Sequence, residues 1–360
     1  MKISVIIPIY NVGQYLRQTL DSVVNQTHQD IEIICINDGS TDDSLKIVED
    51  YASKDQRIKV INQENAGLYI SRQNGIRTAS SDYILFLDGD DWLDIDTCEK
   101  IAATAKDTHA DIIQYGLQVE SPDNNHPDVR WFDAWFNVST KQIDGADEML
   151  KRCYIDRAIP WNIATKAIRS EIAKEAITYQ ESFRINQLED FLSCFFLFFL
   201  SAKWVRLDGK LYHYRYGLGM STKKVITIDD FEKNLQYFKG LQSIQHFVAN
   251  RKVSPIVQEV AMEVMPQYVM NDAFHFIFQR LDKNTDNRLW ADALTNALGR
   301  EATIYALAAK LTLCHAEQAR LMESESQARR KKKKYLHLFR DMCIVSGLLL
   351  IALIALIVLF

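Results

Sequence analysis

A cluster of carboxylates follows an apolar stretch in LFLDGDDWLD, residues 85–94. Asp88 and Asp90 are separated by one glycine, and two such residues beyond a strand end can reach one ion. Mg²⁺ and Mn²⁺ prefer oxygen ligands, often one or two carboxylates together with substrate phosphates. The pair therefore predicts a divalent-cation site. A solvated acidic turn that caps the next helix is the alternative. An EF-hand is excluded because Trp92 and Leu93 occupy its fifth and sixth positions.

A second acidic pair, Glu189 and Asp190, precedes the apolar run FLSCFFLFFL in a segment that reads as a helix over 181–203. A carboxylate within hydrogen-bond reach of a hydroxyl can take its proton, so Asp190 is a candidate general base. The helix dipole also favours acidic residues in the first turn of a helix. The pair alone leaves both explanations open.

The elements that must position these groups alternate through the first 120 residues. Apolar runs predict buried strands over 3–10, 31–37, 57–62, 82–88 and 111–119, with helical periodicity between them. This alternation predicts a Rossmann-like α/β fold, with a mainly parallel sheet and helices on both faces. Ligands of such sheets bind at the carboxyl ends of the strands. The polar stretches after the first, second and fourth predicted strands fall at these ends.

The remainder of the chain changes character several times. A loop is expected over 120–140, a strand hairpin over 203–216 and mostly helical structure from 227 to about 328. Residues 329–334 are RRKKKK, and residues 342–360 carry no charge. At about 1.5 Å per residue the uncharged run is long enough to cross a bilayer, with the basic run on the cytoplasmic side. The expected division is an α/β domain over 1–220, a helical region over 221–328, a basic juxtamembrane segment over 329–341 and a transmembrane helix over 342–360.

Composition excludes some classes of protein. The net charge of −5 over 360 residues argues against a general nucleic-acid binder. The six cysteines form no CxxC pair, which is typical of reduced, buried thiols. The first apolar run is short and broken by Pro8, so it reads as a strand and not as a signal peptide. The bulk of the chain is therefore expected in the cytoplasm.

Five motifs occur in a fixed order along the chain: IPIYN (7–11), NDGSTDDS (37–44), ENAGLYISRQNG (64–75), FLDGDDWL (86–93) and LED (188–190). In this order and spacing the sequence resembles the family 2 glycosyltransferases, which are inverting enzymes of GT-A fold. The resemblance covers roughly residues 3–215. It implies that the domain over 1–220 is a GT-A catalytic domain that takes a sugar from a nucleotide diphosphate.

The resemblance also implies roles for individual residues. Donor-nucleotide contacts are expected from all of the first four motifs, at Pro8, Tyr10, Asp38, Asn65, Gly67, Arg72, Asn74 and Asp88. Asp90 and Asp88 would hold the metal, Mn²⁺ or Mg²⁺, with Asp90 the direct ligand, and Asp190 would be the catalytic base. Contacts to acceptor or diphosphate are expected from Glu189, Trp161, His213 and Arg215, although strand or core packing explains the last three as well.

The sequence therefore predicts an inverting, metal-dependent transfer of a hexosyl or N-acetylhexosaminyl group. The expected donor is a nucleotide sugar, most simply UDP-linked, and the acceptor is a hydroxyl of a glycan or lipid-linked glycan at the cytoplasmic face of the bacterial inner membrane. One hydrophobic run and no QxxRW motif argue against a processive synthase. The alternatives are a non-catalytic, transferase-like membrane scaffold and a metal-dependent nucleotidyltransferase. The sequence leaves open the sugar, the acceptor, the oligomeric state and the role of 221–328.

Overall fold

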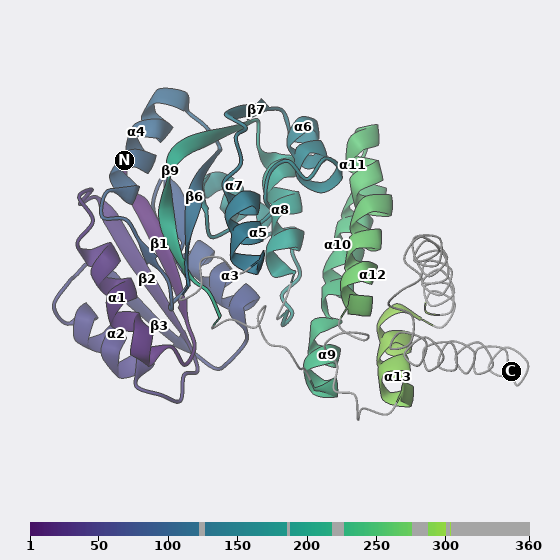
Figure 1. Ribbon diagram of the computed structural model, residues 1–360, viewed down its shortest axis with the longest axis horizontal. Coiled ribbons are helices and arrows are strands. Elements are labelled where there is room, and N and C mark those ends of the chain that lie inside the picture. Colours follow the sequence, from purple (N-terminus) through teal and green to yellow (C-terminus); the bar gives the residue numbers. More distant parts are fainter. Residues whose placement is uncertain (122–126, 186–187, 218–226, 276–286, 300–302, 304–360) are drawn as a thin grey trace, which may run out of the picture. The chain divides into compact units, whose positions relative to one another are not determined.

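The computed structural model describes residues 1–121, 127–185, 188–217, 227–275, 287–299 and 303 (Figure 1). The chain forms two compact units, Met1–Thr285 and Asp286–Phe360. In the second unit the described part is essentially one helix, α13 (Asn287–Leu298). The site discussed below lies entirely in the first unit.

A mixed sheet forms the centre of the first unit. Its strands in the described residues are β1 (Ile3–Ile9), β2 (Ile31–Asp38), β3 (Ile58–Gln63), β4 (Tyr83–Phe86), β5 (Trp92–Leu93), β6 (Ile112–Glu120), β7 (Gln142–Asp144), β8 (Lys166–Arg169) and β9 (Lys203–Arg215). They pair in the order β3-β2-β1-β4-β8-β6-β9-β5, and β7 also pairs with β9.

The expectation of a mainly parallel sheet is corrected by this order. β1 to β4 pair in parallel, but β8 lies antiparallel between β4 and β6, and β5 and β7 are antiparallel to β9. The alternation of strands and helices was readable in the first 120 residues. The four-residue strand β8 was not, because it is too short to show a pattern of its own.

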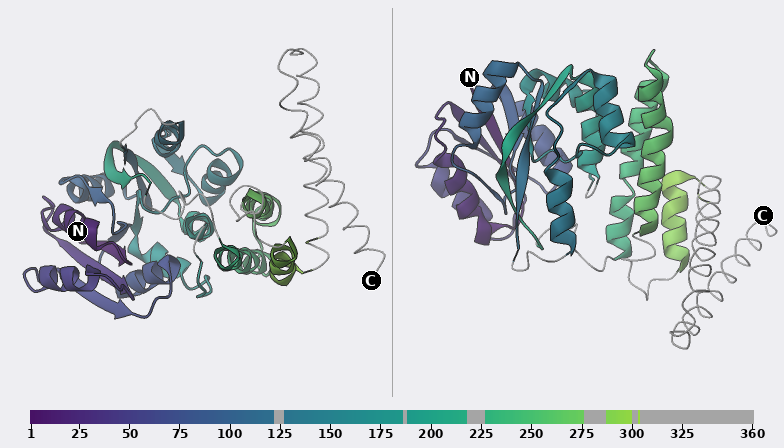
Figure 2. Two further views of the ribbon diagram at one scale, coloured as in Figure 1. Left: turned by 60° about the horizontal axis from the view of Figure 1, so that its bottom comes forward. Right: turned by 45° about the horizontal axis from the view of Figure 1, so that its top comes forward.

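Helices cover both faces of the sheet, as expected. On one face α1 (Gly13–Val24), α2 (Ser44–Ala52) and α4 (Thr97–Thr108) pack against the strands, and on the other α3 (Leu68–Thr78) and α7 (Ser170–Ala176) do so (Figure 2). α8 (Glu189–Leu200) packs against α7. β1 and β2 are buried along their whole length. On the first face Val5 and Ile7 join the core, and on the second Ile6 meets Gly75 of α3, where an added Cβ would lie 2.3 Å from Ile6 Cγ2.

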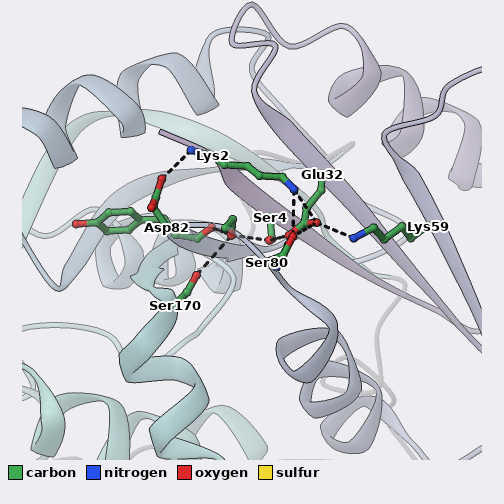
Figure 3. Close-up of polar contacts among 9 residues, drawn as sticks. Lys2, Ser4, Glu32, Lys59, Ser80, Asp82 and Ser170 are labelled. Atoms are coloured by element: carbon green, nitrogen blue, oxygen red, sulfur yellow. Dashed lines mark hydrogen bonds and ion pairs between the residues drawn. The ribbon is translucent and has the colours of Figure 1, made fainter.

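A polar cluster ties the amino-terminal ends of β1 and β2 to the turn before β4 (Figure 3). The Glu32 carboxylate, 3% exposed, pairs with Lys2 Nζ at 3.1 Å and with Lys59 Nζ at 2.9 Å. It also accepts hydrogen bonds from the hydroxyls of Ser4 and Ser80. Every oxygen of this buried acid is thus satisfied. The cluster lies at the end of the strands opposite to the carboxyl ends, so we interpret it as structural.

Two local expectations were wrong in the second half of the unit. Part of the loop expected over 120–140 is a helix, α5 (Pro127–Phe136). The hairpin expected over 203–216 is instead one strand, β9, with register shifts against β6 near Gly116. Alternating residues at 203–216 suit either arrangement. A continuous strand forms because the whole segment finds a parallel partner in β6.

Further helices of the same unit lie before and after β9 in the chain. Before it, α6 (Ala146–Leu150) continues into the short π-helix η1 (Lys151–Ile155). The segments after residue 227 are α9 (Ile228–Asn234), α10 (Tyr237–Ala249), α11 (Pro255–Glu259), η3 (Val260–Val264) and α12 (Met265–His275). α10 packs against α8, and η3 packs against η1, so these helices extend the core on the α8 side (Figure 1).

The expectation of a fold that ends in a transmembrane helix is also corrected. Among the described residues no helix combines the length and the apolar character needed to cross a membrane. The strongly apolar α8 has 12 residues, about 18 Å of helix, which falls short of a bilayer core. Residues 329–341 and 342–360, on which the expectation rested, lie outside the described residues.

Candidate active site

One arginine joins the predicted base to the predicted donor site. The Arg72 guanidinium lies 2.6 Å from Asp190, 2.9 Å from Asp88 and 3.4 Å from Glu189. Arg72 projects from α3, Asp88 follows β4, and the acidic pair opens α8. The structure thus brings together four residues that the sequence singled out, at the carboxyl ends of the parallel strands. Arg72 itself is only 5% exposed.

The start of α8 is shaped to present the acidic pair. Leu188, at the N-cap, has φ of 60°, a left-handed conformation that is uncommon for leucine. Asp190 accepts a backbone hydrogen bond from the Ile163 amide at 3.0 Å through Oδ2, and Arg72 binds Oδ1. Each carboxylate oxygen retains a further lone pair, so both bonds leave room for a proton. Unusual backbone geometry at this position agrees with a functional role for the two acids.

Burial makes both acids more basic than usual. It raises the pKa of Glu189 to about 7, and the neighbouring Asp190 adds to the rise while Arg72 opposes it. Burial also raises the pKa of Asp190, opposed by Arg72 and by the Ile163 amide. The three carboxylates raise the pKa of Arg72 in spite of its burial, so its charge is permanent. A carboxylate with a raised pKa near a fixed cation is suited to accept a proton near neutral pH.

In the turn after β4, Asp91 has a different role from the predicted metal ligands Asp88 and Asp90. Asp91 is 1% exposed and accepts hydrogen bonds from the Tyr212 hydroxyl at 2.6 Å and the Arg215 amide at 2.8 Å. The Tyr212 hydroxyl oxygen in turn accepts a hydrogen bond from the Asp88 amide. Asp91 therefore fixes the turn to β9. The residue between the two predicted ligands must be glycine, since a Cβ on Gly89 would lie 2.9 Å from Val12 and 3.1 Å from the Pro8 carbonyl.

The pair Asp88 and Asp90 fits a cation that arrives with its substrate. Burial, together with the charge of Asp88, raises the pKa of Asp90 to about 6, which marks a carboxylate in need of a counter-charge. Within the described residues no three His, Cys, Asp or Glu side chains converge on one point. Two carboxylates are nevertheless what Mg²⁺ takes from a protein when phosphates supply other ligands.

Arg215 and His213 flank this turn in different ways. Arg215 Nε donates to the Asp90 carbonyl at 3.0 Å, and its guanidinium stacks over Tyr15 and Trp92. His213 stacks on Trp92 and places its ring nitrogens 2.8 Å from Glu120 and 2.8 Å from Asp94. Arg215 thus holds the predicted metal loop, whereas His213 belongs to a neighbouring network.

The expected nucleotide-base residues form a second group at the ends of β1 and β2. The Asp38 carboxylate accepts the backbone amides of Ala66 and Gly67, both at 2.8 Å, and Asn65 donates to the Asp38 carbonyl. Asn74 reaches the same group indirectly, through Gln63. Asp38 therefore shapes the loop before α3. Its own carboxylate is already engaged.

Tyr10 and Pro8 lie on the first strand and the residues just after it. Pro8 is buried in β1, and Tyr10 is 50% exposed, with its ring available to a ligand. Trp161, the remaining predicted contact, lies beside the helix that carries Asp190. Its ring centroid is 5.4 Å from that of Phe191, which follows Asp190 in α8.

Lys166 behind the base was not anticipated from the sequence. It is fully buried, and its Nζ donates to the carbonyls of Pro160 at 2.8 Å and Asn162 at 2.5 Å. These carbonyls belong to the turn whose next amide, on Ile163, binds Asp190. Burial lowers the pKa of Lys166, and the charge of Asp190 opposes this. A lysine in the short strand KAIR gives no warning of this role in the sequence.

Comparisons with known proteins agree with this geometry. Residues 4–160 match the family described as glycosyl transferase family 2. The chain is 34% identical over 220 residues to the putative glycosyltransferase EpsH of Bacillus subtilis, which covers 60% of this chain and 61% of that protein. The chain thus spans less than two thirds of that relative's length.

Solved structures share the fold at low sequence identity. The Staphylococcus aureus TarS fragment 1–349 with UDP-GlcNAc superposes with a TM-score of 0.60 and 20% identity, covering 85% of this chain and 84% of that one. The mannosyltransferase PcManGT of Pyrobaculum calidifontis, in complex with GDP-Man and Mn²⁺, gives 0.51 and 13%, covering 96% and 86%. The motifs, the sheet and the match over residues 4–160 thus make this part of the chain similar to the family 2 glycosyltransferases.

Proposed function

We propose that the protein transfers a sugar, with inversion, from a nucleotide-diphosphate donor to a hydroxyl of a glycan or lipid-linked acceptor. The observation that carries this proposal is the double contact of Arg72 with Asp88 and Asp190. One guanidinium separates the carboxylate assigned to the donor from the carboxylate assigned as base. A donor sugar held at Asp88 would therefore have its anomeric carbon close to Asp190.

The groups of this chain divide the work. The acceptor hydroxyl attacks C1 of the sugar from the face opposite to the diphosphate, the bond from C1 to the phosphate oxygen breaks, and Asp190 takes the hydroxyl proton. Asp88 and Asp90 would hold the divalent cation, Mn²⁺ or Mg²⁺, which when bound offsets charge on the leaving diphosphate. The buried guanidinium of Arg72 keeps the base aligned and adds positive charge beside the departing group.

The proposed donor rests on two solved structures of similar fold. A relative in fold was solved with UDP-GlcNAc and another with GDP-Man. We therefore propose a hexosyl or N-acetylhexosaminyl donor linked to UDP or GDP, and UDP-sugars are the first to test. A role in a bacterial surface polysaccharide and a location of the catalytic unit in the cytoplasm remain predictions from the sequence.

Release of nucleoside diphosphate tests the proposal. Purified protein is incubated with a panel of UDP- and GDP-sugars and Mn²⁺ or Mg²⁺, and thermal stabilisation by each donor is measured in parallel. Asp190→Asn should lower turnover by roughly 10²–10⁴-fold, the usual contribution of a general base, while stabilisation by donor persists. Asp90→Asn should weaken the metal-dependent part of that stabilisation.

A matched control and clear refutations are available. Glu171 also lies in the first turn of a helix, α7, but is exposed, so Glu171→Gln should leave turnover unchanged. Full turnover in Asp190→Asn would refute its assignment as base. Absence of stabilisation by any nucleotide would favour the non-catalytic scaffold, and release of pyrophosphate from a nucleoside triphosphate would favour the nucleotidyltransferase.

A further inference from the structure

A row of aromatic rings leads from the surface of α5 to the base. Trp131 and Trp135, one helical turn apart, stack at 5.9 Å between ring centroids with 7° between their planes. Trp135 meets Trp161 at 5.0 Å, and Trp161 meets Phe191 at 5.4 Å. Phe191 follows Asp190 directly. The row is therefore continuous with the proposed active site.

Packing does not account for the outer part of this row. α5 is held to the sheet by Phe132, whose ring lies 5.7 Å from Tyr214 and 6.0 Å from Tyr216 of the β9 segment. Trp131, on the adjacent face, is 56% exposed. Large aromatic side chains are costly to leave in water, and exposed patches of them commonly mark binding sites. Since α5 is anchored without Trp131, the exposed ring is available to a ligand.

The chemistry of the row favours a carbohydrate. One face of a pyranose ring presents C–H groups, which carry slight positive charge, and an indole presents a negative π-face. A flat aromatic surface therefore binds a sugar ring while the sugar hydroxyls stay in water. An aliphatic lipid chain needs no such flat rings. The row also ends at the carboxylate that must meet an acceptor hydroxyl, which an acceptor glycan would supply at its end.

We propose that Trp131, Trp135 and Trp161 form an acceptor subsite, which binds successive pyranose rings of an oligosaccharide and directs its terminal hydroxyl to Asp190. This inference rests on the proposed transfer function. It adds the residues that would select the acceptor, and it assigns a role to α5, a segment that reads as a loop in the sequence.

Binding to a glycan array that carries pyranose oligosaccharides of one to six residues tests the subsite. Trp131→Leu keeps an apolar side chain but loses the aromatic face, and Trp131→Phe keeps a smaller aromatic face. For wild type we expect binding that strengthens with length. Trp131→Leu should weaken it by roughly two- to tenfold, as one aromatic contact is worth, and Trp131→Phe should retain most of it. Trp135→Leu should act in the same direction.

The donor readout separates this inference from the proposed function. Thermal stabilisation by the nucleotide sugar should be the same in wild type and Trp131→Leu, since the ring lies on the acceptor side of the base. Unchanged oligosaccharide binding in Trp131→Leu and Trp135→Leu would overturn the subsite while leaving donor turnover intact. The subsite would also be overturned, in favour of an apolar partner, if the wild type bound liposomes but no glycan and if Trp131→Leu and Trp135→Leu both lost the liposome binding. If no nucleotide sugar raises the thermal stability of the wild-type protein, the transfer function itself is refuted.

Discussion

Arg72 offers the sharpest test of how this site is built. Replacement by methionine fills much of the same volume but removes the charge that three carboxylates share. Arg72 is 5% exposed and contacts Asp190, Asp88 and Glu189 within 3.4 Å. Removing one partner of a buried ion pair typically costs about 3–5 kcal/mol, because the remaining charge is left without compensation. For a unit of this size, Met1–Thr285, that corresponds to a fall in melting temperature of about 5–8 °C.

The loss of stability should depend on pH in a definite direction. Without Arg72 the folded-state pKa values of Glu189 and Asp190 rise further above their unfolded values of about 4. A raised folded pKa gives stability that is present below the unfolded pKa and is lost as pH rises through the folded pKa. Arg72→Met should therefore be destabilised more at pH 8 than at pH 5.

Urea unfolding at pH 5 and pH 8 measures both effects. Arg77→Met is the matched control, since Arg77 lies on the same helix but is exposed, and it should change stability by less than about 0.5 kcal/mol. Arg72→Lys keeps the charge and should lose less than Arg72→Met. A loss below about 1 kcal/mol at pH 8, or an equal loss at both pH values, would refute the view that Arg72 compensates the buried acids.

Three further changes test the framework around the site. Glu32→Gln should cost about 1.5–3 kcal/mol in urea unfolding, because charged hydrogen bonds are lost. Burial opposes this shift, but hydrogen bonding lowers the pKa of Glu32, so the loss relative to wild type should shrink as pH falls below about 4. Equal losses at pH 3 and pH 7 would contradict this reasoning. Gly75→Ala should cost about 1–3 kcal/mol through the clash with Ile6, and Ile6→Ala should suppress that cost in the double variant; additive losses would exclude the clash. Lys166→Met should shift the acid limb of the turnover profile to higher pH, because the lysine charge favours ionised Asp190; an unmoved profile would assign Lys166 to stability alone.

Much of the site was predictable because motifs and strand ends are local features. A carboxylate pair directly after an apolar strand must lie at the edge of the sheet, and parallel strands bring such edges together. Asp88 could therefore be placed at this edge from its own neighbours, and the alternation of strands and helices over the first 120 residues was readable as well. Arg72 and Asp190 were singled out only by the resemblance of the motifs, and their roles stay predictions. The short strand β8, the helix α5 and the single strand β9 were not, since each depends on a partner that lies far away in the chain.

What only the tertiary structure decided is which charges meet. Arg72 and Asp190 are separated by 118 positions, and their contact at 2.6 Å forms because α3 and α8 both pack against α7. The resemblance implied a donor contact for Arg72 and could not show that Arg72 also pairs with Asp190. Lys166 holds the turn that contacts Asp190 through backbone carbonyls, which carry no sequence signature. Side-chain types and local spacing are written in the sequence, whereas burial and long-range pairing, which set the pKa values and orient the groups, exist only once the chain has folded.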